Sequence, residues 1–401
     1  MEHFPRTYEA MLREHLETLR QMAFLCGPRQ IGKTTICRSL TEIYLDWDNE
    51  DHRRLIIDGP AAVAEHCGLN SPMGNKVTIT FDELHKYDQW KQFMKGFFDV
   101  YSDRANMLVS GSSKLDIYRH GGDSLMGRYF LYNMHPLSTA ELANNPTQPP
   151  SNLIQPPAKL NYKDWQALLY HGGFPEPFVR RDTTFTHRWR KHRHYQLFKE
   201  DLPDVTDIEA IDKVEVLGKI LLNKSGETLN FATLATSVAE SENTCREWVE
   251  TLSDLHYGFT IDPWVENVNY SMRREPKWYL CDWSSIKDPD KFAENLIACH
   301  LWKAAEEWTD LGLGDFSLHY VNDKDKRECD FLFSYDDTPW ILVEAKANPS
   351  PMSPNLFHFQ KILDVPYAFQ VTVKAKYVEQ DCFSITEPLE VPARTFLSQL
   401  F

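Results

Sequence analysis

The sequence predicts an α/β protein whose first domain is built on a central, mostly parallel sheet. Three observations support this prediction. A short apolar stretch at 21–26 leads through a glycine-rich loop into a helical pattern. Two further apolar stretches, 77–81 and 106–109, end in acidic and hydroxyl residues. Strands that alternate with helical patterns favour a parallel sheet covered by helices.

The glycine-rich loop is the most specific motif of the chain. It fits the pattern G-x-x-x-x-G-K-[ST], the phosphate-binding P-loop. Its glycines let the backbone turn tightly and direct N–H groups at phosphate oxygens, and the helix N-terminus adds partial positive charge. In this pattern Lys33 reaches the β- and γ-phosphates and Thr34 Oγ1 binds Mg²⁺. We therefore expect ATP to lie against Gly27, Pro28, Arg29, Gln30, Ile31, Gly32, Lys33, Thr34 and Thr35.

The elements around the loop follow from apolar spacing. Helical spacing predicts a helix at 10–19 before the loop and another at 35–44 after it, with Ile36, Leu40 and Ile43 on one face. A strand ending in acids is expected at 43–48.

An acidic pair, Asp82-Glu83, ends the strand expected at 77–83. Such a pair some fifty residues after a P-loop is a Walker B signature. Asp82 would hold the Mg²⁺ shell, and Glu83 would orient or deprotonate the attacking water. The alternative is an acidic pair on a solvated loop. Thr78 and Thr80 depart from the aliphatic residues usual in such a strand.

Two later strands bring further candidates. The strand at 106–113 has a polar tip that would lie beside the γ-phosphate if it neighbours the P-loop strand; Ser110 and Ser112 are its candidates, against a plain Ser/Gly turn. Arg128 precedes a fifth strand at 129–132. Because arginine is always charged and binds phosphate bidentately, it can act on the γ-phosphate of a neighbouring subunit. The alternative is a surface or packing arginine.

Composition narrows the class of protein. A chain of 401 residues with 42% hydrophobic and 13% aromatic residues is long enough for two or three domains. The net charge of −15 argues against coating nucleic acid by charge alone. Residues 1–20 do not form a secretory signal, no run reaches the length of a membrane span, and eight scattered cysteines lack a C-x-x-C pair. We expect a cytoplasmic protein with reduced thiols and no membrane contact.

The ordered set of motifs extends to Ser124-Leu125-Met126-Gly127-Arg128 and His135-Pro136-Leu137-Ser138. With this set the chain resembles the prokaryotic AAA+ ATPases of the archaeal-ATPase-like group that carry a C-terminal domain of unknown function. The resemblance covers nearly the whole chain. It implies a AAA+ fold and slow ATP hydrolysis, with Ser110 to Ser112 resembling sensor 1 and Arg128 an arginine finger.

The middle of the chain predicts a linker, and the resemblance to the AAA+ ATPases implies a helical lid after it. Residues 144–157 are rich in Pro, Asn and Gln, and a helix at 164–170 stops at Gly172-Gly173, which we interpret as structural. The run 187–194 is the densest basic segment. It either touches phosphate groups or is a solvated helix face.

Three helices at 212–223, 231–238 and 241–256, then strands at 259–264 and 277–282, follow winged-helix order. Acids crowd the third helix, whereas the wing carries Arg273, Arg274 and Lys277. Because carboxylates repel phosphate, we favour protein contact or positioning over sequence-specific DNA reading.

In the last part of the chain, a helix at 291–308 precedes strands at 318–321, 329–334 and 340–346. Asp330, Glu344 and Lys346 on these strands match the D…E-x-K pattern. With this pattern the last 110 residues or so resemble the PD-(D/E)xK nuclease superfamily, and Glu294 on the helix would complete a Mg²⁺ shell of oxygen ligands. Lys346 faces the same side as Glu344 and would stabilise developing charge; Gln360 is a further candidate. The alternative is a structural ion pair that does not cut.

The expected domains are therefore 1–143 (AAA+ P-loop ATPase), 144–205 (linker and lid), 206–285 (winged-helix-like) and 286–401 (nuclease-like). The leading hypothesis is an ATPase that uses ATP and Mg²⁺ to switch or drive a nucleic-acid or protein partner, with Lys33, Glu83 and Arg128 in catalysis. Two alternatives stay open: an ATP-gated, metal-dependent DNA endonuclease and a non-hydrolysing nucleotide-binding scaffold. A working Arg128 finger requires a homo-oligomer.

Overall fold

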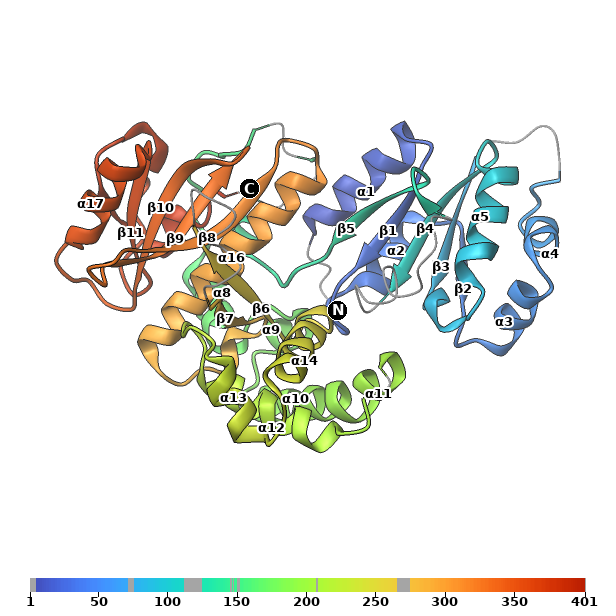
Figure 1. The fold of residues 1–401 in the computed structure, drawn as a ribbon. Coiled ribbons are helices and arrows are strands. Elements are labelled where there is room, and N and C mark those ends of the chain that lie inside the picture. Colours follow the sequence, from blue (N-terminus) through green and yellow to red (C-terminus); the bar gives the residue numbers. More distant parts are fainter. Residues whose placement is uncertain are drawn as a thin grey trace. The chain divides into compact units, whose positions relative to one another are not determined.

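A computed structural model describes residues 5–70, 76–111, 125–144, 146, 148–149, 152–206, 208–264 and 275–400. The chain forms two compact units (Figure 1). The N-terminal unit contains Pro5–His135 and Pro146–Pro149, and the C-terminal unit contains Pro136–Asn145 and Pro150–Phe401. No helix of the described residues is long and apolar enough to cross a membrane.

The N-terminal unit is built on a five-stranded, all-parallel sheet in the order β2-β3-β4-β1-β5. This order places the P-loop strand β1 between β4 and β5, so the carboxyl ends of β1, β3 and β4 lie along one edge. The elements in chain order are α1 (Thr7–Thr18), β1 (Met22–Cys26), α2 (Lys33–Leu40), β2 (Ile43–Asp46), α3 (Glu50–Ile57), α4 (Pro60–His66), β3 (Val77–Asp82), α5 (Trp90–Tyr101), β4 (Ala105–Gly111) and β5 (Tyr129–Asn133).

One face of this sheet carries an aromatic core. Phe81 packs edge-on against Phe93 and Phe97 of α5, and Phe24 stacks on Tyr129. Burying each such ring contributes about 1.5–3 kcal/mol. The strands expected from the sequence are all present.

The helix expected at 35–44 was placed too far along the chain. Helix α2 ends at Leu40, because Thr41 is extended (φ −123°, ψ 143°) and Ile43 pairs with Ile79 in the sheet. Thr41 and Ile43 are β-branched, which favours extended backbone over helix.

The C-terminal unit begins with helices. They are α7 (Thr139–Asn144), α8 (Tyr162–His171), α9 (Pro175–Arg180), α10 (Thr183–Gln196), a π-helical turn at Leu197–Asp201, α11 (Leu202–Val205), α12 (Ile211–Asn223), α13 (Phe231–Val238) and α14 (Glu242–Asp254). Helices α12, α13 and α14 lie where the sequence predicted three helices.

The Gly172-Gly173 pair lies in close packing. A Cβ atom on Gly173 would come within 2.6 Å of Trp283 and 2.8 Å of the Leu137 carbonyl oxygen. At Gly172, where φ is +80°, a Cβ would lie 2.9 Å from Asp282 Oδ1. Only glycine fits such approaches without displacing backbone, which supports the structural interpretation of this pair.

The basic run lies on α10 and is divided between packing and solvent. The Arg193 guanidinium stacks over the Phe174 ring at 4.1 Å, and Arg190 donates hydrogen bonds to Ser284 and Tyr170. His187, Arg188, Lys191 and His192 are exposed. The run is therefore more than a solvated face.

A seven-stranded sheet in the order β12-β11-β10-β9-β8-β6-β7 forms the rest of this unit (Figure 1). Its strands are β6 (Gly258–Pro263), β7 (Lys277–Leu280), β8 (Phe316–Asn322), β9 (Glu328–Tyr335), β10 (Thr338–Lys346), β11 (Tyr367–Thr372) and β12 (Leu389–Pro392). The ribbon β6–β7, expected as a wing, joins this sheet because Asp262 and Pro263 pair with His319 and Tyr320 of β8. Arg273 and Arg274 lie outside the described residues.

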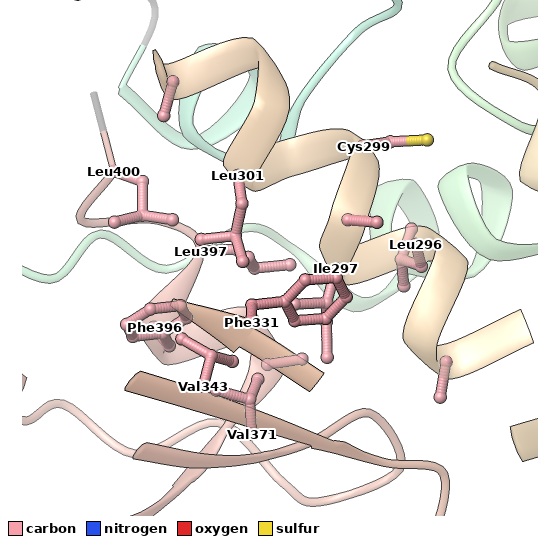
Figure 2. Packing of buried hydrophobic residues seen from close by; sticks show 14 of the residues in the cluster. Leu296, Ile297, Cys299, Leu301, Phe331, Val343, Val371, Phe396, Leu397 and Leu400 are labelled. Carbon is pink, nitrogen blue, oxygen red and sulfur yellow. The ribbon is translucent and has the colours of Figure 1, made fainter. Parts of the chain in front are cut away.

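Helix α16 (Pro289–Asp310) packs on one face of the sheet (Figure 2). Its residues Leu296, Ile297 and Leu301 meet a layer formed by Phe331, Val343, Val371, Phe396 and Leu397. Helix α17 (Pro354–Leu363) contributes Leu356 and Phe359 to a second cluster, with Leu332 and Leu342. The chain ends after α18 (Ala393–Phe396). Residues of the central strands β9 and β10 are thus buried on both faces of the sheet.

Candidate functional site

The P-loop connects β1 to α2 at the carboxyl edge of the sheet. A Cβ atom on Gly27 would lie 2.5 Å from the Met134 carbonyl oxygen, so only glycine fits there. Gly32 has φ of +108° and Gln30 has φ of +64°, both in the left-handed region. These turns form the bend that brings the chain into the first turn of α2, where a phosphate group would meet backbone N–H groups.

The Lys33 side chain is buried and folded back onto the loop. Its Nζ donates hydrogen bonds to the carbonyl oxygens of Gly27 (2.7 Å) and Pro28 (2.9 Å). Burial lowers the pKa of Lys33, while Glu83 and Asp82 act in the opposite direction. A phosphate group would be a stronger partner for the ammonium than these two neutral carbonyls.

The Asp82 carboxylate collects three hydroxyl groups. Thr34 Oγ1 lies 3.3 Å from Asp82 Oδ2, Tyr44 also donates to Oδ2, and Ser110 donates to Oδ1. Asp82 is nearly buried, so these bonds replace water around the charge. A carboxylate and a threonine hydroxyl side by side are hard oxygen donors of the kind that Mg²⁺ prefers.

Tyr44 was not among the predicted site residues. Burial, followed by the contact with Asp82, raises its pKa. Tyr44 lies in β2, two residues before Asp46 at the carboxyl end of the strand. This nearness was the signal in the sequence, because the carboxyl ends of parallel strands share one edge.

Glu83 has a strained backbone and two basic neighbours. Its φ of +53° is in the left-handed region, which costs a non-glycine residue about 1 kcal/mol or more. The Oε2 atom lies 3.6 Å from His85 Nε2 and 3.5 Å from Lys86 Nζ. Burial lowers the pKa of His85 to about 4, so this ring is neutral at pH 7.

Strand β4 neighbours the P-loop strand, as the interpretation of Ser110 required. Ser110 pairs in register with Leu25 of β1 and with Asp82 of β3. Ser112 lies outside the described residues.

Arg128 lies at the opposite edge of the sheet from the P-loop. Its carbonyl oxygen accepts from the Met22 N–H at the start of β1, whereas the P-loop follows the end of β1. The guanidinium donates to both oxygens of Asp99, at 2.8 and 3.2 Å. From there it cannot reach the phosphates of its own P-loop, so any action on a nucleotide must be on that of another subunit.

The C-terminal unit brings the predicted acidic residues together. Phe331 of β9 pairs with Val343 of β10, which places Asp330 across from Glu344. Asp330 Oδ2 accepts from the Ala345 N–H at 2.8 Å. Lys346 Nζ lies 2.8 Å from Glu344 Oε1, consistent with both side chains on one side of the strand.

Lys277 lies in the middle of this cluster. Its Nζ is 2.6 Å from Glu328, 3.2 Å from Glu294 and 4.0 Å from Asp330. Tyr279 donates to Glu294 at 2.8 Å. We call the set Lys277, Tyr279, Glu294, Glu328, Asp330, Glu344 and Lys346 the acidic cluster.

Lys277 was expected among the basic residues of a wing, but the structure does not leave it on a basic surface. The residue is 3% exposed and neutralises carboxylates instead. Lys277 and Tyr279 were missed because the ribbon β6–β7 was assigned to another module, whereas Glu328, the first residue of β9, was not recognised as part of the site. Lys277 is a charged residue in the otherwise apolar strand β7, and this was the signal in the sequence that it is buried with carboxylates.

Burial, and then repulsion by Asp330, raise the pKa values of Glu294 and Glu344. Burial likewise raises the pKa of Asp330, against the pull of Lys277. Burial alone would lower the pKa of Lys277, but Glu294, Asp330 and Glu328 raise it. A divalent cation would relieve the repulsion between these carboxylates.

Among the described residues, however, no group of three or more His, Cys, Asp or Glu side chains is arranged to hold a metal ion. Lys277 and Lys346 already engage Glu294 and Glu344. Gln360 is not in the cluster, because its amide donates to the Thr386 carbonyl oxygen.

Comparison with known families agrees with the geometry of the first site. Residues 19–143 match the model of the AAA domain family. Together with the parallel sheet and its strand order, this match supports a P-loop AAA+ ATPase core. Residues 162–286 match a domain of unknown function (DUF8612).

Two curated relatives are uncharacterized proteins of Mycobacterium bovis and Mycobacterium tuberculosis. Each is 24% identical over 265 residues, which is 65% of this chain and 54% of the relative. The chain thus spans about half the length of the curated relatives it matches.

Among solved structures, AMPPCP-bound DnaA from Aquifex aeolicus is 12% identical, with a TM-score of 0.30 over 63% of this chain and 89% of that chain. The Aeropyrum pernix ORC1 protein in complex with DNA is 13% identical, with a TM-score of 0.29 over 72% and 90%. Scores this low carry no argument about the arrangement of this protein.

Proposed function

We propose that the protein is an ATPase that binds Mg·ATP at the P-loop and uses turnover to switch or drive a partner held by the C-terminal unit. The observation that carries the proposal is the group at the carboxyl edge of the sheet. Buried Lys33 lies in a glycine-dependent loop, and Asp82 gathers the hydroxyls of Thr34 and Ser110 beside it.

In this proposal the residues have separate tasks. Lys33 leaves its two carbonyl partners for the β- and γ-phosphates. Thr34 and Asp82 are the oxygen donors for Mg²⁺, which would neutralise phosphate charge when bound. Glu83 orients or deprotonates water, and the Lys86 ammonium, 3.5 Å from Glu83 Oε2, attracts its carboxylate.

The test is phosphate release from Mg·ATP. We expect Lys33→Ala to abolish release and Glu83→Gln to slow it about a hundredfold or more while nucleotide still binds. Lys95→Ala, exposed on α5, is the matched control for loss of a positive charge. If Glu83→Gln and wild type are equally slow and both bind ATP, the protein is a nucleotide-binding scaffold and the ATPase proposal is wrong.

A second candidate function is metal-dependent nucleic-acid cleavage at the acidic cluster. It is favoured by the placement of Asp330 across from Glu344, with Lys346 two residues further along β10. The carboxylates of Glu294, Asp330 and Glu344 are hard oxygen donors of the kind that a divalent cation binds. Metal entry would require Glu294 and Glu344 to exchange their lysine partners for the cation.

Cleavage of plasmid and linear duplex DNA with Mg²⁺ or Mn²⁺ tests this candidate. Asp330→Ala should abolish cutting, whereas Asp325→Ala, on the exposed turn before β9, should not. Intact DNA in all samples would exclude the nuclease and leave the acidic cluster as a structural network.

A further inference from the structure

A pocket of about 580 Å³ lies in the C-terminal unit, between α8, α10, the loop before α16, the start of α16 and the residues after β10 and β11. Five basic or imidazole side chains line it: His171, His187, Arg190, Lys287 and Lys374. None of the described residues that line it is Asp or Glu. This is unexpected in a chain with a net charge of −15.

Most of the remaining lining is apolar, with the hydroxyl groups of Thr183, Thr186 and Ser284 among it. The apolar residues come from five segments, namely Leu169, Ile286, Phe292 with Ala293, Ala347 and Val373. The volume falls within the roughly 300–1,000 Å³ usual for sites of small organic ligands. An apolar wall combined with cationic side chains suits a ligand that has a ring and an anionic group.

Arg190 is held in place for such a ligand. Its Nε donates to Ser284 Oγ at 3.0 Å and one terminal nitrogen, Nη2, donates to the Tyr170 carbonyl oxygen at 2.9 Å. In the part of the chain that the structure describes, no hydrogen bond involves its other terminal nitrogen. A guanidinium fixed in this way loses little side-chain freedom on binding a phosphate.

Two sequence motifs build this arrangement. Ser284 donates to Asp282 Oδ1, and the absence of a side chain at Gly172 allows Asp282 and Ser284 to approach α8. Arg190 belongs to the basic run of α10. The Gly-Gly stop and the basic run, which the P-loop does not explain, therefore meet at this pocket.

The pocket adjoins the strands that carry the acidic cluster. Ala347 directly follows Lys346, and the Val373 N–H donates to the Lys346 carbonyl oxygen at 2.9 Å. The Lys374 N–H donates to the Ala347 carbonyl oxygen at 3.1 Å. These backbone hydrogen bonds continue the pairing of β10 with β11 and thus fix the position of the Lys374 backbone at the pocket.

We infer that this pocket binds a nucleoside phosphate, with the base and sugar against the apolar wall and the phosphate on Arg190, Lys287 and Lys374. A free nucleotide and the 5′-terminal nucleotide of a single strand share this chemistry. The site is separate from the P-loop, and all its lining residues belong to the C-terminal unit.

The test uses the full chain with Lys33→Ala, so that the P-loop does not contribute. Two probes, 5′-AMP and a 5′-phosphorylated tetrathymidylate, are titrated by calorimetry. We expect saturable binding of at least one probe, weakened about tenfold by Arg190→Gln and by Lys374→Gln, since each removes a charge-assisted hydrogen bond. Arg188→Gln and Lys376→Gln are matched controls, because both residues are exposed and neither lines the pocket.

The probe that binds identifies the source of the phosphate. Binding of AMP indicates a free nucleotide, and binding of the oligonucleotide alone indicates the end of a strand. If neither probe binds, or if pocket variants and controls bind equally, the inference is wrong. Thermal unfolding tests whether Arg190→Gln still folds, because this variant loses two internal hydrogen bonds. If it does not fold, the exposed variant Lys374→Gln decides whether the inference holds.

Discussion

Tyr44 and Asp82 show how the nucleotide site is stabilised at the level of single residues. Without nucleotide, the Asp82 charge is balanced by hydroxyl groups from α2, β2 and β4. Hydrogen bonds to a charged group contribute about 1.5–3 kcal/mol each. If Mg·ATP binds as proposed, the metal shell takes over part of this role.

Tyr44→Phe should therefore destabilise the protein more without nucleotide than with it. We expect a loss of about 1.5–3 kcal/mol in the free energy of unfolding in the absence of Mg·ATP, and a smaller loss in its presence. Chemical denaturation with and without Mg·ATP measures both values. Tyr87→Phe is the control, since its hydroxyl reaches only exposed Gln89 at 3.4 Å. Equal losses in both conditions would argue against a changing partner for Asp82.

His300 on α16 should make stability depend on pH. Burial lowers its pKa to about 4. Its Nδ1 donates to the Leu296 carbonyl oxygen and its Nε2 accepts from the Thr139 N–H, so the neutral ring is fully bonded. Because the unfolded chain binds this proton near pH 6.5, stability is lost as pH falls from about 6.5 to 4.

His300→Gln should remove that part of the pH dependence. Between pH 7 and 4.5 we expect the wild type to lose about 2–3 kcal/mol more than the variant, by urea denaturation at each pH. His66→Gln, at an exposed position on α4, is the control. A wild type and a His300 variant with parallel pH profiles would refute the role assigned to this ring.

At the scale of elements, α16 is anchored by a buried ion pair. Lys303 contacts Glu141 of α7, lies 3.6 Å from Glu307 and donates to the Pro136 carbonyl oxygen. All three charged side chains are buried. The helix therefore depends on this lysine to neutralise carboxylates that water does not reach.

Lys303→Met should cost about 3–5 kcal/mol, because it leaves buried carboxylates uncompensated. The double variant Lys303→Met/Glu141→Leu should recover much of this loss, since it removes the unpaired charge. Lys291→Met, in the exposed pair with Glu227 at the start of α16, should cost at most about 1 kcal/mol. Thermal and urea unfolding of the three variants measures the differences.

Elements with a strong local pattern were predictable from the sequence, and their neighbours in space were not. Helix α13 and the strands of the first sheet follow from apolar spacing and lie where expected. The pairing of β6 with β8 joins residues 262 and 319, and no local pattern reports so distant a contact. For the same reason Lys277 was assigned to a wing instead of the acidic cluster, whereas Asp330 and Glu344 were found through a spaced motif.

At the scale of the whole molecule, a role for Arg128 as an arginine finger would require a second subunit. Arg128 lies at the edge of the sheet away from its own P-loop, held by Asp99. If it completes the site of a neighbour, two defective variants should rescue each other. A mixture of Lys33→Ala and Arg128→Ala would contain interfaces in which an intact P-loop meets an intact finger.

An equimolar mixture of these variants should regain about a quarter of wild-type phosphate release if subunits pair at random. A mixture of Lys33→Ala with Asp82→Ala should regain none, because both changes affect the same site. Gel filtration with and without ATP supplies the independent measurement. A monomer under both conditions, with no rescue, would rule out a finger acting between subunits.

The seven-stranded sheet contains strands from both sides of residue 286, and this limits where the chain can be divided. The segment that matches the domain of unknown function ends at 286, so it contains β6 and β7 but not β8. Cut there, it would expose the edge of β6 as a template for unwanted strand pairing and would leave Lys277 without Glu294, Glu328 and Asp330. The boundary recognised in sequences is thus not one at which the chain separates into pieces that fold alone, and expression of this segment should extend through the last strand of the sheet.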